Sequence, residues 1–143
     1  MVMSYKFIEG LTLADVAFEA TGSTLEELFE SAGLAVTKTQ IENLDTIKHT
    51  ESLKIKLNAE TFEQLLHDFL QEIIFYKDAK LLLFNKYSIK INENHCKLEA
   101  VLLGEKIDMS RHELLVDVKA ITWHYFSLKK NNDKWIATVV VDV

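Results

Sequence analysis

The chain has no proline and only four glycines among its 143 residues. No segment therefore has the composition of a Pro-rich or Gly/Ser-rich linker, and we find neither an internal repeat nor a low-complexity tract. A chain of this length forms one domain with a hydrophobic core and is too short for two of ordinary size. The sequence predicts a single domain over residues 1–143.

Cysteine is also scarce, since Cys96 is the only one. This excludes an intrachain disulfide and a zinc centre built on several thiolates. No apolar run is long enough to span a bilayer, and the charged residues Lys6 and Glu9 distinguish the first ten residues from a secretory signal peptide. We expect a protein of a reducing compartment, the cytoplasm.

Basic residues are outnumbered by acidic ones, 16 against 22, which gives a formal charge of −6. Affinity for phosphate backbones comes mainly from Lys and Arg, so this balance argues against a nonspecific nucleic-acid binder. We expect that RNA, if it is involved, is reached through a partner protein. Nearly half of the residues are apolar and about a quarter are charged, as in folded globular proteins.

Two segments have the apolar spacing of amphipathic helices. In residues 23–36, Ser23 and Glu26 have the spacing of a capping box, and the apolar stripe is Leu25, Leu28, Phe29, Ala32, Ala35 and Val36. In residues 60–76, either Asn58 or Thr61 can cap the first turn, and the stripe is Phe62, Leu65, Leu66, Phe69, Leu70, Ile73 and Ile74. The second helix should lie at the centre of the core.

Three other segments alternate with period two and predict half-buried strands: residues 53–57, 87–91 and 96–102. Polar residues 92–94 and 129–134 predict hairpin turns. The order is strand, helix, strand, helix and then a run of strands. This order is typical of an α+β domain with a mainly antiparallel sheet and two helices packed on one face.

The final strand "VVVDV" contains Asp142, where burial of a charge would be costly. If residues 129–134 form the loop and Leu128 pairs with Trp135, Asp142 lies opposite Ile121 on the more polar face, together with Lys119. His124 then lies on the core face, where histidine is more often a hydrogen-bonded core residue than a ligand.

The carboxylate of Asp142 should also lie next to that of the last residue, Val143. Two anions this close require a cation. Lys119 could supply it as an ion pair, or a metal ion could bind. Oxygen-only ligation favours calcium or magnesium over a transition metal.

Several segments resemble the archease family: "FIEGLTLADVAFEA", "TLEELFESAGLAV", "GEKIDMSRHELLVDVKAITWHYFSL" and "WIATVVVDV". The resemblance spans nearly the whole chain and implies a small α+β domain. It also implies an activating, chaperone-like partner of the RNA ligase that joins 3′-phosphate and 5′-hydroxyl ends in tRNA splicing and RNA repair. Such a protein promotes guanylylation and multiple turnover of the ligase and has no complete active site of its own.

The resemblance further implies a divalent-cation site, with calcium as the expected ion, formed by Asp15, Asp142 and Val143. Without it, Asp15 would be interpreted as a turn or capping aspartate. The family's histidine three residues before this aspartate is Thr12 here, so the imidazole is missing. A tyrosine of the family is replaced by Trp123, which we expect to be an aromatic surface residue.

Other candidates for metal or partner contact are Asn43, Asp45, His112, Lys119 and His124. A further family aspartate falls at Asn43, with Asp45 close by. His112 lies in a polar turn, as a contact residue or simply solvated. The sequence leaves open whether a nucleotide lies at the interface with the ligase.

Two other functions stay open. One is a freestanding metal-dependent hydrolase that activates water at the acidic cluster, although we identify no groups for substrate positioning or proton transfer. The other is a generic chaperone or scaffold with a structural ion. The sequence has no Walker loop, G-x-G-x-x-G or H-E-x-x-H motif, and the adjacency of Ser110 and His112 does not make a catalytic triad.

Overall fold

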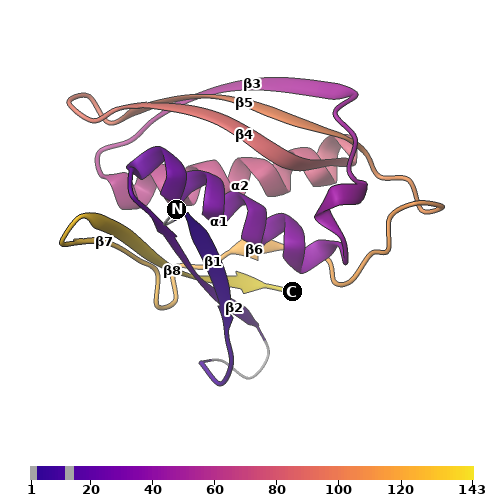
Figure 1. Cartoon of the computed structure of the whole chain (residues 1–143), viewed down its shortest axis with the longest axis horizontal. Helices are drawn as coiled ribbons and strands as arrows, with labels where there is room; N and C mark the ends of the chain where they lie inside the picture. The colour runs from indigo at the N-terminus through magenta and orange to yellow at the C-terminus, as the bar shows by residue number, and fades with distance from the viewer. Residues whose placement is uncertain (1–2, 12–14) are drawn as a thin grey trace.

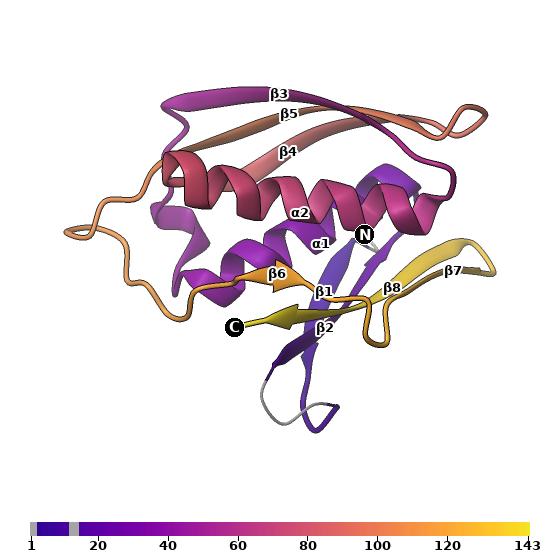
Figure 2. The same ribbon diagram turned by 180° about the vertical axis from the view of Figure 1, so that it is seen from behind.

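In the computed structural model, which describes residues 3–11 and 15–143, two helices lie between two antiparallel sheets (Figures 1 and 2). The predicted α+β class with two helices and mainly antiparallel strands is confirmed. The strands divide into two sheets instead of one, and the helices cover the inner face of each. Neither helix of the described part of the chain is long and apolar enough to cross a membrane.

The larger sheet contains both ends of the chain. The strands β1 (Ser4–Ile8), β2 (Val16–Gly22) and β8 (Lys134–Asp142) lie side by side in that order. The short strands β6 (Ala120–Ile121) and β7 (Ser127–Asn131) both pair with β8. All these pairings are antiparallel.

The smaller sheet has the order β3 (Glu51–Asn58), β5 (Lys97–Lys106) and β4 (Leu82–Asn92). It contains all three segments predicted as strands. Cys96, predicted in a strand, instead ends the four-residue turn between Asn92 and Lys97 and has a left-handed φ of 50°. Polar and charged side chains alternate with apolar ones along each strand, so one face of the sheet packs on the helices and the other faces solvent.

The helices α1 (Leu25–Gln40) and α2 (Phe62–Lys80) bury the apolar stripes predicted from their spacing. Thr61 caps α2, as predicted, by accepting from the Gln64 N–H. The cap of α1 is Thr24 and not Ser23: the Thr24 hydroxyl accepts from the Glu27 N–H at 3.1 Å, and the Glu27 carboxylate accepts from the Ser23 N–H at 2.9 Å. The predicted capping box is therefore displaced by one residue.

The predicted register of the last hairpin is wrong. Asn131 pairs with Lys134 across a two-residue turn, so Leu128 lies opposite Ala137 instead of Trp135. The lysines and asparagines of "KKNNDK" mostly extend the two strands, because polar side chains are tolerated where both faces of a strand are exposed. Their polar composition alone predicts a loop.

The pairing to β8 is also interrupted between β6 and β7 by residues 122–126, within which Tyr125 has a left-handed φ of 57°. Ala120 lies opposite Asp142 and Ile121 opposite Val141. Ile121 is therefore buried in the core, and His124 is exposed. The predicted faces of these two residues are reversed, because the intervening loop breaks the strict alternation.

Candidate functional site

The predicted site residues Asp15 and Asp142 lie at the same end of two paired strands, β2 and β8. Asp15 directly precedes β2, Asp142 is the last residue of β8, and Val16 lies opposite Val141. Continuing this register by one residue places the two aspartates opposite each other. Sequence segments from the two ends of the chain thus bring two carboxylates to one end of this strand pair. We call this end of the larger sheet the Asp15–Asp142 edge.

Lys119 contacts Asp142 through the backbone only. Its N–H donates to the carbonyl of Asp142 at 2.8 Å. Among the described residues, no ion pair joins the Lys119 ammonium to the Asp142 carboxylate. Asp117 receives its cation from α2, because it pairs with the buried Lys77. The ion-pair explanation for Asp142 is therefore wrong.

The donors at this edge suit a hard cation better than a transition metal. They are carboxylate oxygens, Asp142 is partly buried, and Val143 follows it directly. No group of three or more His, Cys, Asp or Glu side chains that could hold a metal occurs within residues 3–11 and 15–143. A cation here would thus need backbone carbonyls, water or a partner to complete its shell. Thr12, the departure from the family pattern, lies outside the described residues.

The candidates Asn43 and Asp45 belong to a short 3-10 helix, Leu44–Thr46. The Asn43 side-chain oxygen caps this turn by accepting from the Asp45 N–H at 3.0 Å. No hydrogen bond or ion pair in the described part of the chain joins either residue to Asp142. The structure therefore gives Asn43 a local capping role.

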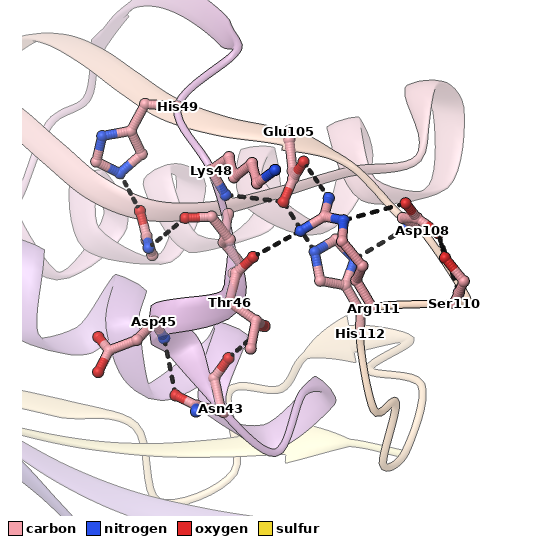
Figure 3. A network of polar contacts seen from close by, with 12 residues as sticks. Asn43, Asp45, Thr46, Lys48, His49, Glu105, Asp108, Ser110, Arg111 and His112 are labelled. Carbon is pink, nitrogen blue, oxygen red and sulfur yellow. Dashed lines mark hydrogen bonds and ion pairs between the residues drawn. The ribbon is translucent and has the colours of Figure 1, made fainter.

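His112 belongs to a buried polar network at the end of β5 (Figure 3). Its Nε2 lies 2.9 Å from Oε2 of Glu105, and its Nδ1 lies 2.9 Å from the backbone nitrogen of Asp108. A backbone N–H can only donate, so Nδ1 accepts and Nε2 carries the proton. His112 is only 3% exposed, so the solvated alternative is wrong.

Glu105 is the centre of this network. Its carboxylate accepts from His112, from the backbone N–H of Lys48 at 2.8 Å and from Arg111 at 2.5 Å. Burial alone would raise the pKa of Glu105, but these hydrogen bonds and the guanidinium charge lower it to about 2. The buried carboxylate is therefore ionised and fully partnered at neutral pH.

Arg111 connects three segments of the chain. Besides Glu105, it donates to the carbonyl of Thr46 at 3.1 Å and to Asp108 at 3.2 Å. The Ser110 hydroxyl also donates to Asp108, at 2.6 Å, and thus has a different partner from the His112 ring. Arg111 fixes the connection that follows β5 against the connection that precedes β3 (Figure 3).

Sequence reasoning missed the Glu105 network. The signal was the close spacing of Glu105, Asp108, Arg111 and His112 just after an alternating strand. Glu105 lies among solvent-facing positions of that strand, and only the folding of two loops over it makes it buried. Sequence alternation does not show such a covering.

The remaining candidate, His124, lies in the exposed loop between β6 and β7, and its ring contacts that of Tyr125. Trp123 is 52% exposed, in agreement with its expected surface position. Its ring stacks on His67 of α2, with centroids 3.9 Å apart. Burial lowers the pKa of His67, although its hydrogen bond to the Ile121 carbonyl and the charge of Asp68 oppose this.

Curated relatives match the chain over nearly its full length. The archease of Sulfurisphaera tokodaii is 32% identical over 130 residues, which cover 91% of this chain and 93% of the relative. The archease of Pyrococcus abyssi is 35% identical over 133 residues with the same coverage.

Solved structures share the arrangement of two helices and two sheets. The solution structure of protein 1598 from Methanobacterium thermoautotrophicum matches with a TM-score of 0.84 and 30% identity, over 98% of this chain and 99% of that one. The archease of Thermotoga maritima matches in fold, with a TM-score of 0.66 and 24% identity over 92% of this chain and 93% of that one. A sequence model of the archease protein family matches residues 5–143. The chain belongs to the archease family.

Proposed function

We propose that the protein is an accessory protein that activates the ligase joining 3′-phosphate and 5′-hydroxyl RNA ends, and that it is not itself a catalyst. The observation that carries the proposal is the register of β2 and β8, which brings Asp15 and Asp142 to one edge in a chain that matches the archease family over residues 5–143. These are the residues to which the family resemblance assigns the divalent-cation site.

A divalent cation, calcium in our proposal, would supply positive charge between the two carboxylates and leave coordination positions for a partner. Asp15, Asp142 and Val143 would hold it. The carboxylate of Asp142 is not neutralised by Lys119, so the protein leaves this charge for another cation. The backbone hydrogen bond from Lys119 to Asp142 fixes the main chain at the end of β8.

A multiple-turnover ligation assay with the cognate ligase tests the function. Adding the protein should raise the number of ligation events per ligase, and Asp15→Ala and Asp142→Ala should each reduce this stimulation at least tenfold. Asp133→Ala is the matched control, because Asp133 lies in the exposed turn between β7 and β8. It should stimulate as well as the wild type.

Unchanged ligation in the presence of the wild-type protein would refute activation. Hydrolysis of RNA ends by the protein alone, lost in Asp142→Ala, would support the freestanding hydrolase instead. A general chaperone is the third possibility, because the Thermotoga maritima archease is described as a possible chaperone. Protection of unrelated aggregating proteins without any effect on the ligase would favour that general role here.

A further inference from the structure

The outer face of the β3-β5-β4 sheet is strongly basic, although the protein as a whole is acidic. Lys54 and Lys56 of β3, Lys86 and Lys90 of β4 and Lys97 of β5 are all exposed on it. Glu105 of β5 lies on the same side but is buried, so Glu99 is the only exposed acidic residue of this face in these strands. We call the five lysines and Glu99 the lysine face. No helix or strand covers this side of the sheet in either view of the ribbon (Figures 1 and 2).

Positive and negative charges are distributed unevenly over the protein, and the net charge does not show this. The lysine face has five of the 16 basic residues and one of the 22 acidic ones, so its formal charge is +4. The chain total is −6, which leaves −10 on all other residues. A polyanion would therefore be attracted to this face and repelled elsewhere.

Strand pairing sets the lysines out in a regular array. Lys56 and Lys90 flank Glu99 in one cross-strand row. Lys54 lies two residues along β3 from Lys56, and Lys86 lies four residues along β4 from Lys90. Residues two apart on one strand are separated by about 6.6 Å, and neighbouring strands by about 4.8 Å. Such a spacing lets several ammonium groups reach successive phosphates of one extended strand.

Protection of exposed sheet edges explains only part of the array. Lysine on edge strands discourages aggregation, and β3 and β4 are the edge strands of this sheet. Five of the six ionisable residues have the same sign, and Lys97 lies on the central strand. The selection of one sign indicates an anionic ligand.

We propose that the lysine face binds the phosphate backbone of single-stranded RNA. The face has no aromatic side chain for base stacking, so it would contact the backbone without reading sequence. It also has no exposed aromatic or large apolar side chain to insert into a lipid surface. The choice of RNA over other polyanions rests on the proposed function beside an RNA ligase.

Fluorescence anisotropy of a labelled single-stranded RNA 12-mer with the protein alone tests this, and it does not depend on ligase stimulation. We expect a Kd of about 10⁻⁶ to 10⁻⁴ M at physiological salt. With about four phosphates contacted, affinity should fall about 50-fold between 50 and 200 mM salt. The variant Lys54→Gln/Lys56→Gln/Lys90→Gln should bind at least tenfold more weakly.

The matched control is Lys129→Gln/Lys130→Gln/Lys134→Gln, which removes the same charge from the exposed hairpin of β7 and β8. It should retain affinity within about twofold. Glu99→Gln should strengthen binding, because its carboxylate lies 3.6 Å from the Lys56 ammonium and partly neutralises it. Glu63→Gln, which removes an exposed carboxylate from α2, should leave binding unchanged. Thermal melts confirm that each variant folds.

Equal losses in the two triple variants would overturn the proposal, because binding would then follow net charge alone. Binding to phosphatidylserine vesicles or to polyglutamate with no binding to RNA would also overturn it. Loss of RNA binding with intact ligase stimulation would show that the lysine face and the Asp15–Asp142 edge act separately.

Discussion

At the scale of single residues, Glu105 shows how a buried charge can organise an irregular part of a fold. Glu105 is 5% exposed, and its carboxylate accepts three hydrogen bonds, from Lys48, Arg111 and His112. Lys48 precedes Glu105 in the sequence, whereas Arg111 and His112 follow it. A buried carboxylate with this many donors is stable only while it is ionised.

The pH dependence of stability follows from this carboxylate. The folded pKa of Glu105 is lowered to about 2 from an ordinary value of 4.5. Because the folded pKa is depressed, the stabilisation is complete above about pH 4.5 and is lost as the pH falls towards 2. Between pH 6 and pH 3, Glu105 should account for a loss of about 2 kcal/mol in the free energy of unfolding.

Urea unfolding of the wild type and of Glu105→Gln at both pH values measures this contribution. The variant should be less stable at pH 6, and its stability should change less with pH than that of the wild type. Glu63→Gln, which removes an exposed carboxylate, should follow the wild type. Identical pH profiles for wild type and Glu105→Gln would contradict the assignment.

At the scale of elements, the N-cap observed at the start of α1 differs from the one predicted from the sequence. The Thr24 hydroxyl accepts from the Glu27 N–H, whereas Ser23 takes part only through its backbone N–H. Thr24→Ala should reduce the free energy of unfolding by about 1 kcal/mol. Ser23→Ala should change it by less than about 0.5 kcal/mol. Chemical denaturation compares them, and a larger loss in Ser23→Ala would show that the sequence-based cap was correct.

Both helices and the three middle strands could be predicted from the sequence, because each has a continuous apolar periodicity. The stripes of α1 and α2 contain several of the largest buried side chains, such as Phe29 and Phe69. Periodicity of this kind reflects a face that must be buried, so it is visible in the sequence. The same reasoning predicts that the strands of the smaller sheet are half-buried, with one face towards solvent.

The register of β6, β7 and β8 could not be predicted in this way. The turn at Asn132 and Asp133 is shorter than the polar segment around it suggests. Tyr125 adopts a left-handed backbone conformation, which the sequence does not indicate because the residue is not glycine. Each feature shifts the pairing, and a shift by one residue reverses the faces. His124 and Ile121 were misplaced for this reason. The expected proximity of Asp15 and Asp142 does not depend on this hairpin, because it follows from the pairing of β2 with β8, which is regular up to Val16 and Val141.

At the scale of the whole molecule, two distant regions of opposite charge face different surroundings. The lysine face lies on the solvent side of the smaller sheet, and the Asp15–Asp142 edge belongs to the larger sheet across the two helices (Figure 1). If both proposals hold, the protein would contact a polyanion on one side and hold a cation on the other. The total charge of −6 describes neither surface.

The same architecture makes a cation at the Asp15–Asp142 edge a link between the two ends of the chain, because β2 and β8 are neighbours in the sheet. A ligand that binds only the folded state stabilises it by mass action, by about 2.7 kcal/mol at a concentration 100-fold above its Kd. With roughly 3 °C per kcal/mol for a domain of this size, saturating calcium should raise the Tm of the wild type by about 8 °C.

Asp142→Ala should abolish this rise, whereas Asp133→Ala, in the exposed β7–β8 turn, should keep it. Differential scanning calorimetry with and without calcium, after treatment with a chelator, makes the comparison. Magnesium in parallel distinguishes the two hard cations, since calcium tolerates an irregular oxygen shell and magnesium requires a nearly octahedral one. A calcium-independent Tm in the wild type would exclude the site, and an equal rise in Asp142→Ala would place the ion elsewhere.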